Sequence, residues 1–206
     1  MSDATLSPNQ PEPAPGASEA LWSKWVHDKL IETTLSKYCG SIQDLLKRSS
    51  LNADAAHNGD GVEDVLLHGM WPYPAIQDSS VIVAMIDQRL EARMQLAEAA
   101  VRTGNWNEAI WQLGKALHTI SDRLSPPHVS ANGIPRKWPI PLGERNEHTR
   151  FLPWAGKETW NQMTGPILAQ ITAQYNTAME RVIFAGQATS NYMPTCRSPV
   201  WTGSSR

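Results

Sequence analysis

The chain has 206 residues, with 18 lysines and arginines against 20 aspartates and glutamates, and its pI is near 6.3. That length allows one domain with a full hydrophobic core, and the near-neutral charge argues against a protein that holds duplex nucleic acid by bulk charge alone. A nuclease is still allowed, because bound metal ions would add positive charge that this count omits.

Residues 1–19 are rich in Pro, Ser and Ala and predict a disordered leader or linker. They contain neither a basic n-region nor an apolar h-region, so we expect no ordinary signal peptide. The chain has no run of about 20 apolar residues, and we expect no membrane-spanning helix. We therefore expect a cytoplasmic protein as synthesised, or one exported by a contractile or other signal-independent secretion system.

Helical periodicity dominates the rest of the chain and predicts an all-α fold. A single helical domain is expected over residues 20–186, followed by an irregular tail over residues 187–206. The first helix is expected over Leu21–Lys47, with a break near Gly40, and a polar loop is expected over Ser49–Gly61.

Asp78–Arg102 predicts a long helix that is opened by an Asp-Ser-Ser cap. Trp106–Leu124 predicts the next helix, because its apolar residues form a stripe at helical spacing. Val129–Pro153 is a long Pro- and Gly-rich excursion of the kind that more often serves function than not. Thr159–Ala185 predicts a last helix, in which Gly165-Pro166 marks either a kink or the true start.

The most informative stretch is Gly114–His128, which reads GKALHTISDRLSPPH. His118 and Asp122 are four residues apart, so on a helix they share one face. Pro126 and Pro127 cannot continue that helix, and the turn that they force can bring His128 back to the same place. Two imidazoles and a carboxylate suit zinc. The alternative is a capping arrangement, in which a histidine is favoured at a helix C-terminus.

The string H-x-x-x-D-x-x-x-P-x-H, filled by His118, Asp122, Pro126 and His128, resembles the zinc-dependent phospholipase C family. That family is related in fold to the single-strand-specific zinc nucleases. The surrounding letters ALHTISDRLSPPHV are most similar to a module at the C-terminal ends of Rhs-type bacterial polymorphic toxins. The resemblance is specific over residues 105–129 and looser over residues 22–128. It implies an all-helical fold, two or three zinc ions and hydrolysis of phosphodiester bonds.

The resemblance also implies roles for individual residues. His118 and Asp122 would bind a paired zinc site that Asp122 bridges, and His128 would bind the neighbouring zinc. His68 matches an upstream zinc histidine, and His27 matches a first-helix histidine that binds a third zinc. The alternatives are a loop histidine stacked on an aromatic ring for His68 and an exposed helical residue for His27.

The family also needs an aspartate upstream of His68, and Asp54, Asp60 and Asp64 compete for that role. The string G-V-E-D favours Asp64, which we expect to bind metal and to accept a proton from the attacking water, beside the catalytic ligand Asp122. An exposed acidic loop is the alternative.

The chain departs from the family after P-x-H, where the family places H-x-x-x-E. Here His148 is itself expected to bind metal, but Leu152 follows it at that spacing, so the carboxylate is missing. Glu144, four residues before His148, is the expected metal-binding substitute, with Glu147 and Glu158 as other candidates.

The aromatic residues Trp71, Tyr73 and Trp138 are expected to flank the cleft and contact substrate. The first hypothesis is a monomeric, zinc-dependent phospholipase C-like enzyme that hydrolyses phospholipid head groups, acting as a toxin or effector with an immunity-like inhibitor as partner. The second is a zinc nuclease on the same scaffold, since stacking aromatics suit bases and lipids alike. The third is a non-catalytic helical module with a structural metal site.

Overall fold

A computed structural model of the chain describes residues 19–56, 61–72, 75–138, 160–163 and 165–193. These residues are mostly helical, which confirms the predicted all-α class. In the described ranges, pairing of extended backbone is limited to two isolated bridges, Trp71 with Lys137 and Val129 with Pro135.

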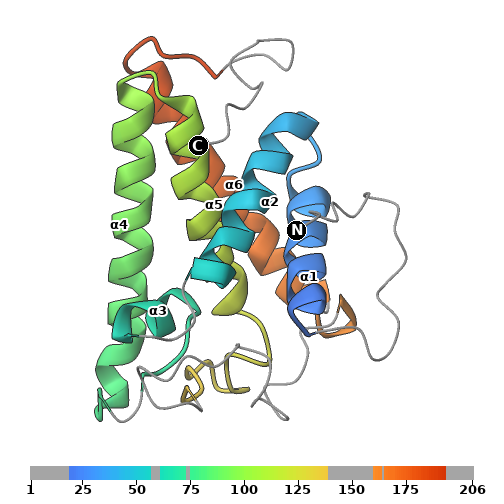
Figure 1. The fold of residues 1–206 in the computed structure, drawn as a ribbon, viewed down its shortest axis with the longest axis vertical. Coiled ribbons are helices and arrows are strands. Elements are labelled where there is room, and N and C mark those ends of the chain that lie inside the picture. Colours follow the sequence, from blue (N-terminus) through green and yellow to red (C-terminus); the bar gives the residue numbers. More distant parts are fainter. Residues whose placement is uncertain (1–18, 57–60, 73–74, 139–159, 164, 194–206) are drawn as a thin grey trace.

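Six α-helices and two short 3-10 turns make up the described part of the fold (Figure 1). Among these helices, none combines the length and the apolar character that crossing a bilayer requires. The elements in chain order are α1 Glu19–Thr34, α2 Gly40–Ala56, α3 Val62–Leu67, η1 Ser79–Val81, α4 Ile82–Arg102, α5 Trp106–Asp122, η2 Trp160–Gln162 and α6 Gly165–Gln187.

Helix α5 occupies the middle of the molecule and packs against α2, α4 and α6 (Figure 1). Twelve of its 17 residues are buried, because neighbours cover it on several sides. The main hydrophobic core lies around it and takes side chains from α1, α2, α4, α5 and α6.

Most predicted helix boundaries are confirmed. The chain leaves α1 at Thr34 and re-enters helix at Gly40, which is the expected break. Asp78 caps the start of the predicted long helix by accepting a hydrogen bond from the backbone N–H of Ser80 at 2.8 Å. The Gly165-Pro166 pair marks the true start of α6 and not a kink, because a proline is well tolerated in the first turn of a helix.

The polar loop that we expected over Ser49–Gly61 is wrong in its first half, because α2 continues to Ala56. Ser49 and Ser50 are buried against α5 and are not solvated. The Ser49 hydroxyl donates to the backbone carbonyl of Trp111, and the Ser50 hydroxyl contacts His118. The polar sequence therefore predicted the wrong environment for these two serines, because their small hydroxyl side chains find hydrogen-bonding partners between α2 and α5.

The close approach of α2 and α5 depends on Gly114. A Cβ at this position would lie 2.6 Å from Ser49 Cβ and 2.8 Å from the backbone carbonyl oxygen of Leu46.

Gly40, which begins α2, is a matched control for a substitution at Gly114, because a Cβ at Gly40 would have nothing within 4 Å. We expect Gly114→Ala to be less stable than Gly40→Ala by about 1–3 kcal/mol, because only the first substitution overpacks an interface. Urea denaturation of the two variants measures the difference, and equal midpoints would contradict it.

Candidate metal centre

The last turn of α5 is polar and yet buried. His118 and Asp122 are each only 1% exposed, and Thr119 and Ser121 are buried between them. Buried charged groups are rare in proteins unless they are paired or bind a metal. This turn is therefore the natural place to look for a site.

Four histidines surround the carboxylate of Asp122. Oδ2 lies 3.1 Å from His68 Nδ1, 3.1 Å from His118 Nε2 and 3.6 Å from His128 Nδ1, while Oδ1 lies 3.3 Å from His27 Nε2. All four histidine residues are at most 5% exposed. The histidines come from α1, from the residue after α3, from α5 and from the loop after α5, so the fold gathers them from four separate segments.

Three of these atoms have the spacing of ligands around a single ion. His68 Nδ1, His118 Nε2 and Asp122 Oδ2 form a triangle with every side 3.1 Å long. Ligands about 2.0–2.1 Å from zinc lie about 3.3 Å apart in tetrahedral geometry and about 2.9 Å apart in octahedral geometry. The observed spacing falls between these values, so one ion could contact all three atoms with little movement.

A second group of candidate ligands shares His118 and Asp122 with the first and adds His27. His27, His118 and Asp122 each offer one atom, and these atoms lie within 4.8 Å of one another. Asp122 Oδ1 is buried and makes no hydrogen bond of good geometry with the described residues. A buried carboxylate oxygen in that condition is costly unless a cation faces it. The donor set thus fits a metal ion.

Electrostatics keep Asp122 charged inside the protein. Burial acts to raise the pKa of Asp122, but electrostatic attraction from the side chains of His118 and His128, together with contacts from His118 and His27, outweighs it. The pKa of Asp122 therefore stays well below its usual value. The ionised carboxylate is the form that binds a metal.

The position of His68 is set by the end of α3. Met70 N–H donates to the carbonyl of Val65 at 3.1 Å, and Gly69 N–H donates to the carbonyl of Leu66 at 3.0 Å. This is the Schellman arrangement, with Gly69 in the left-handed region at φ 62°. The motif ends the helix directly after His68 and turns the chain away, which leaves His68 facing α5.

The loop after α5 returns His128 to the same place. His128 Nδ1 lies 2.8 Å from the carbonyl oxygen of His68, which can accept the ring N–H. The backbone carbonyl of His128 accepts a hydrogen bond from Arg136 N–H at 2.8 Å, and Trp138 N–H donates to the carbonyl of Trp71 at 2.7 Å. The first part of the predicted Val129–Pro153 loop therefore pairs with the segment that follows His68.

The structure places the other expected residues as follows. Asp64 is half-buried in the first turn of α3, four residues before His68. Trp71 donates its indole N–H to the carbonyl of Ile76 at 2.7 Å, and Lys137 Nζ lies 4.9 Å from the centre of its ring. Trp138 is buried and stacks on His68, with the ring centres 5.8 Å apart. The catalytic role of Asp64 and the substrate-binding roles of Trp71 and Trp138 stay predictions.

The remaining candidates lie outside the described residues: Asp60, Tyr73, Glu144, Glu147, His148 and Glu158.

One of the sequence alternatives does not fit. His27 is 2% exposed, so it is not a solvated helical residue. His68 does stack on an aromatic ring, that of Trp138, and it also faces Asp122.

Three hydroxyl residues at the site were missed by sequence reasoning. Ser121 Oγ lies 3.0 Å from His27 Nδ1, and Ser50 Oγ lies 3.3 Å from His118 Nδ1. Thr119 Oγ1 donates to the carbonyl of Leu67 at 2.7 Å and ties α5 to the residue before His68. The only sequence signal for these hydroxyl residues was the presence of Thr119 and Ser121 among the apolar residues of the α5 stripe. Ser50 had been placed in a loop.

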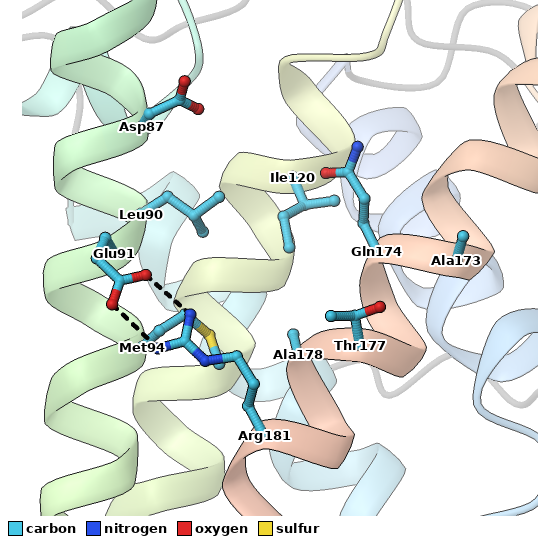
Figure 2. A pocket seen from close by; sticks show the side chains of 10 residues that line it. All are labelled: Asp87, Leu90, Glu91, Met94, Ile120, Ala173, Gln174, Thr177, Ala178 and Arg181. Atoms are coloured by element: carbon cyan, nitrogen blue, oxygen red, sulfur yellow. Dashed lines mark hydrogen bonds and ion pairs between the residues drawn. The ribbon is translucent and has the colours of Figure 1, made fainter.

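A separate hollow of about 470 Å³ lies between α4, α5 and α6 (Figure 2). Leu90, Met94 and Ile120 give it an apolar floor, and Arg181 of α6 pairs with Glu91 of α4 beside it. Ile120 is two positions from both His118 and Asp122, so it lies on another face of α5. This hollow is therefore distinct from the histidine cluster.

Comparison of the chain with protein-family models, with curated proteins and with solved structures found no match.

Proposed function

We propose that this protein is a zinc-dependent phosphodiester hydrolase. The observation that carries the proposal is the convergence of His27, His68, His118 and His128 on the buried carboxylate of Asp122. Imidazole nitrogen and carboxylate oxygen are the ligands that catalytic zinc prefers. The resemblance of the His118–His128 string to zinc-dependent phospholipases C adds support from the sequence.

Two metal ions are proposed, one toward each oxygen of Asp122. Oδ2 faces His68 and His118, whereas Oδ1 faces His27. A carboxylate whose oxygens are directed at different histidines could hold two ions. When bound, zinc acts as a Lewis acid toward water and toward phosphoryl oxygens.

The chain's own residues would hold and orient these ions. Asp122 would supply the negative charge of the site, since its carboxylate faces all four histidines. His128 donates its ring N–H toward the carbonyl of His68, so Nε2 is the ring nitrogen that would bind a metal. Asp64, one helical turn before His68, is proposed to accept a proton during hydrolysis.

A phospholipid head group is the substrate class that we put first, with single-stranded nucleic acid second. Trp71, Tyr73 and Trp138 are proposed to contact the substrate. Toxin or effector activity, an immunity-like inhibitor and a monomeric state remain parts of the same proposal.

A structural metal site is the second candidate, and complete burial favours it. All five ligand residues are at most 5% exposed, whereas a catalytic metal must keep one position open to water or substrate. Zinc would then contribute to folding and would perform no chemistry.

We expect the purified protein to bind two zinc ions and to hydrolyse a phosphodiester only when zinc is present. Zinc per chain is measured by elemental analysis, after removal of metal with a chelator and reconstitution. Hydrolysis is then followed on p-nitrophenylphosphorylcholine, on bis-p-nitrophenyl phosphate and on single-stranded DNA. Activity on the first identifies a phospholipase C-like enzyme, and activity on DNA alone identifies a nuclease.

The remaining outcomes decide between catalysis and structure. One tightly held ion, no turnover of any substrate and a cooperative loss of helix on chelation would establish the structural site and overturn the hydrolase proposal. A protein that binds no zinc would overturn both.

A further inference from the structure

Ser121 lies where it can control the orientation of His27. Its hydroxyl oxygen lies 3.0 Å from His27 Nδ1, 2.8 Å from the carbonyl oxygen of His118 and 3.1 Å from that of Leu117. Ser121 is fully buried, so solvent does not compete for these contacts. The contact joins α5 to α1 across 94 positions of the sequence.

A serine hydroxyl has one proton to donate and two lone pairs with which to accept. The carbonyl of His118 is the nearest acceptor, at 2.8 Å, and the carbonyl of Leu117 is the helical back-bonding partner of such a serine. With its proton directed to the helix backbone, Ser121 Oγ is left to accept. Its partner on that side is His27 Nδ1, which must then carry the proton.

We propose that Ser121 is a positioning residue, which accepts the Nδ1–H of His27 and thereby aims His27 Nε2 at Asp122. This inference depends on the proposed function, since it assigns a role to the group behind one of the metal-facing histidines. His27 Nε2 lies 3.3 Å from Asp122 Oδ1, so the ring already presents that nitrogen to the carboxylate with which it would hold an ion. Metal-binding histidines commonly donate their second ring N–H to such a partner.

A catalytic serine is excluded by the same contacts. Ser121 contacts His27, and His27 contacts Asp122, in the order of a Ser–His–Asp triad. Its oxygen is buried, however, and its proton is directed at the backbone of its own helix. A nucleophile needs access to substrate and a base that takes its proton, and Ser121 has neither.

The experiment compares Ser121→Ala with Ser121→Thr, which restores a hydroxyl, and with Ser49→Ala as a matched control. Ser49 is also buried and donates to a backbone carbonyl, but its partner belongs to Trp111. Zinc affinity is measured by competition with a chromophoric chelator. We expect Ser121→Ala to weaken zinc binding about 10–100-fold, as is typical for loss of an outer-shell partner, and Ser121→Thr to recover most of it. Ser49→Ala is expected to bind zinc like the unchanged protein.

A second readout observes the hydrogen bond directly. Long-range ¹H–¹⁵N spectra of protein with ¹⁵N-labelled histidine report which ring nitrogen of His27 carries a proton. We expect a protected Nδ1–H in the unchanged protein, with and without zinc, and its rapid exchange or loss in Ser121→Ala.

Each result has a definite meaning. Unchanged zinc affinity with a retained Nδ1–H in Ser121→Ala would overturn the role of Ser121 and leave the metal centre standing. An equal loss of affinity in Ser49→Ala would also overturn it, because the effect would then be one of packing. If the unchanged protein binds no zinc, the proposed function fails, and the metal-free spectra still decide whether Ser121 orients His27.

Discussion

Replacing Asp122 by asparagine is expected to remove zinc binding while the helices stay formed. The amide keeps the size of the carboxylate but loses the negative charge that faces four imidazoles. Loss of an outer-shell partner typically costs 10–100-fold in metal affinity, so loss of this central ligand should cost more than about 100-fold. Zinc titration and the zinc content of the purified variant measure the effect.

The same variant should lose the stabilisation that zinc gives to the native state. At a free zinc concentration of 100 times Kd, binding stabilises a protein by about 2.7 kcal/mol. For a chain of this size that corresponds to a rise in Tm of roughly 5–10 °C. We expect this rise in the unchanged protein and none in Asp122→Asn.

Asp44→Asn is the matched control, because Asp44 is a helical aspartate whose side chain is 68% exposed. It should keep both the zinc affinity and the zinc-dependent rise in Tm. If Asp122→Asn binds zinc as tightly as this control does, the cluster around Asp122 is not the metal site.

Replacing Gly69 by alanine is expected to lower the free energy of unfolding by about 2–5 kcal/mol. The left-handed conformation of Gly69 costs an L-residue about 1–2 kcal/mol. Its Cβ would also lie 2.9 Å from both the Cα and the backbone nitrogen of Arg123, and overpacking of that kind adds about 1–3 kcal/mol. A backbone neighbour cannot move aside as a flexible side chain can, so α3 must separate from the end of α5. Urea denaturation measures the loss.

That separation should also weaken zinc binding, since His68 directly precedes Gly69 and faces Asp122. Gly104 supplies the control, because it follows α4 with φ 79° and an added Cβ would meet only the side chain of Asn191, at 3.4 Å. Gly104→Ala should therefore lose only the conformational part, about 1–2 kcal/mol, and should keep zinc affinity. Equal losses in the two variants would show that the approach of Gly69 to Arg123 is not a constraint.

The helices were predictable because their signals are local. Apolar spacing and the Asp78 cap act within a few residues, and each gave a boundary that the structure confirms. The end of α2 was not predictable in this way. Ser49 and Ser50 look like loop residues, yet they are buried because Gly114 lets α5 approach them closely.

The sequence by itself determined the all-α class and the pairing of His118 with Asp122, since four residues are one turn of a helix. It also marked His27, His68 and His128 as candidates through their resemblance to a zinc hydrolase family. Only the tertiary structure decided that these histidines meet at one carboxylate, because they lie on segments separated by up to about 100 residues and no local rule sets such distances. It alone supplied Ser121 and Ser50 behind the rings, since a hydroxyl gains a role at the site only from the neighbour that packing brings to it.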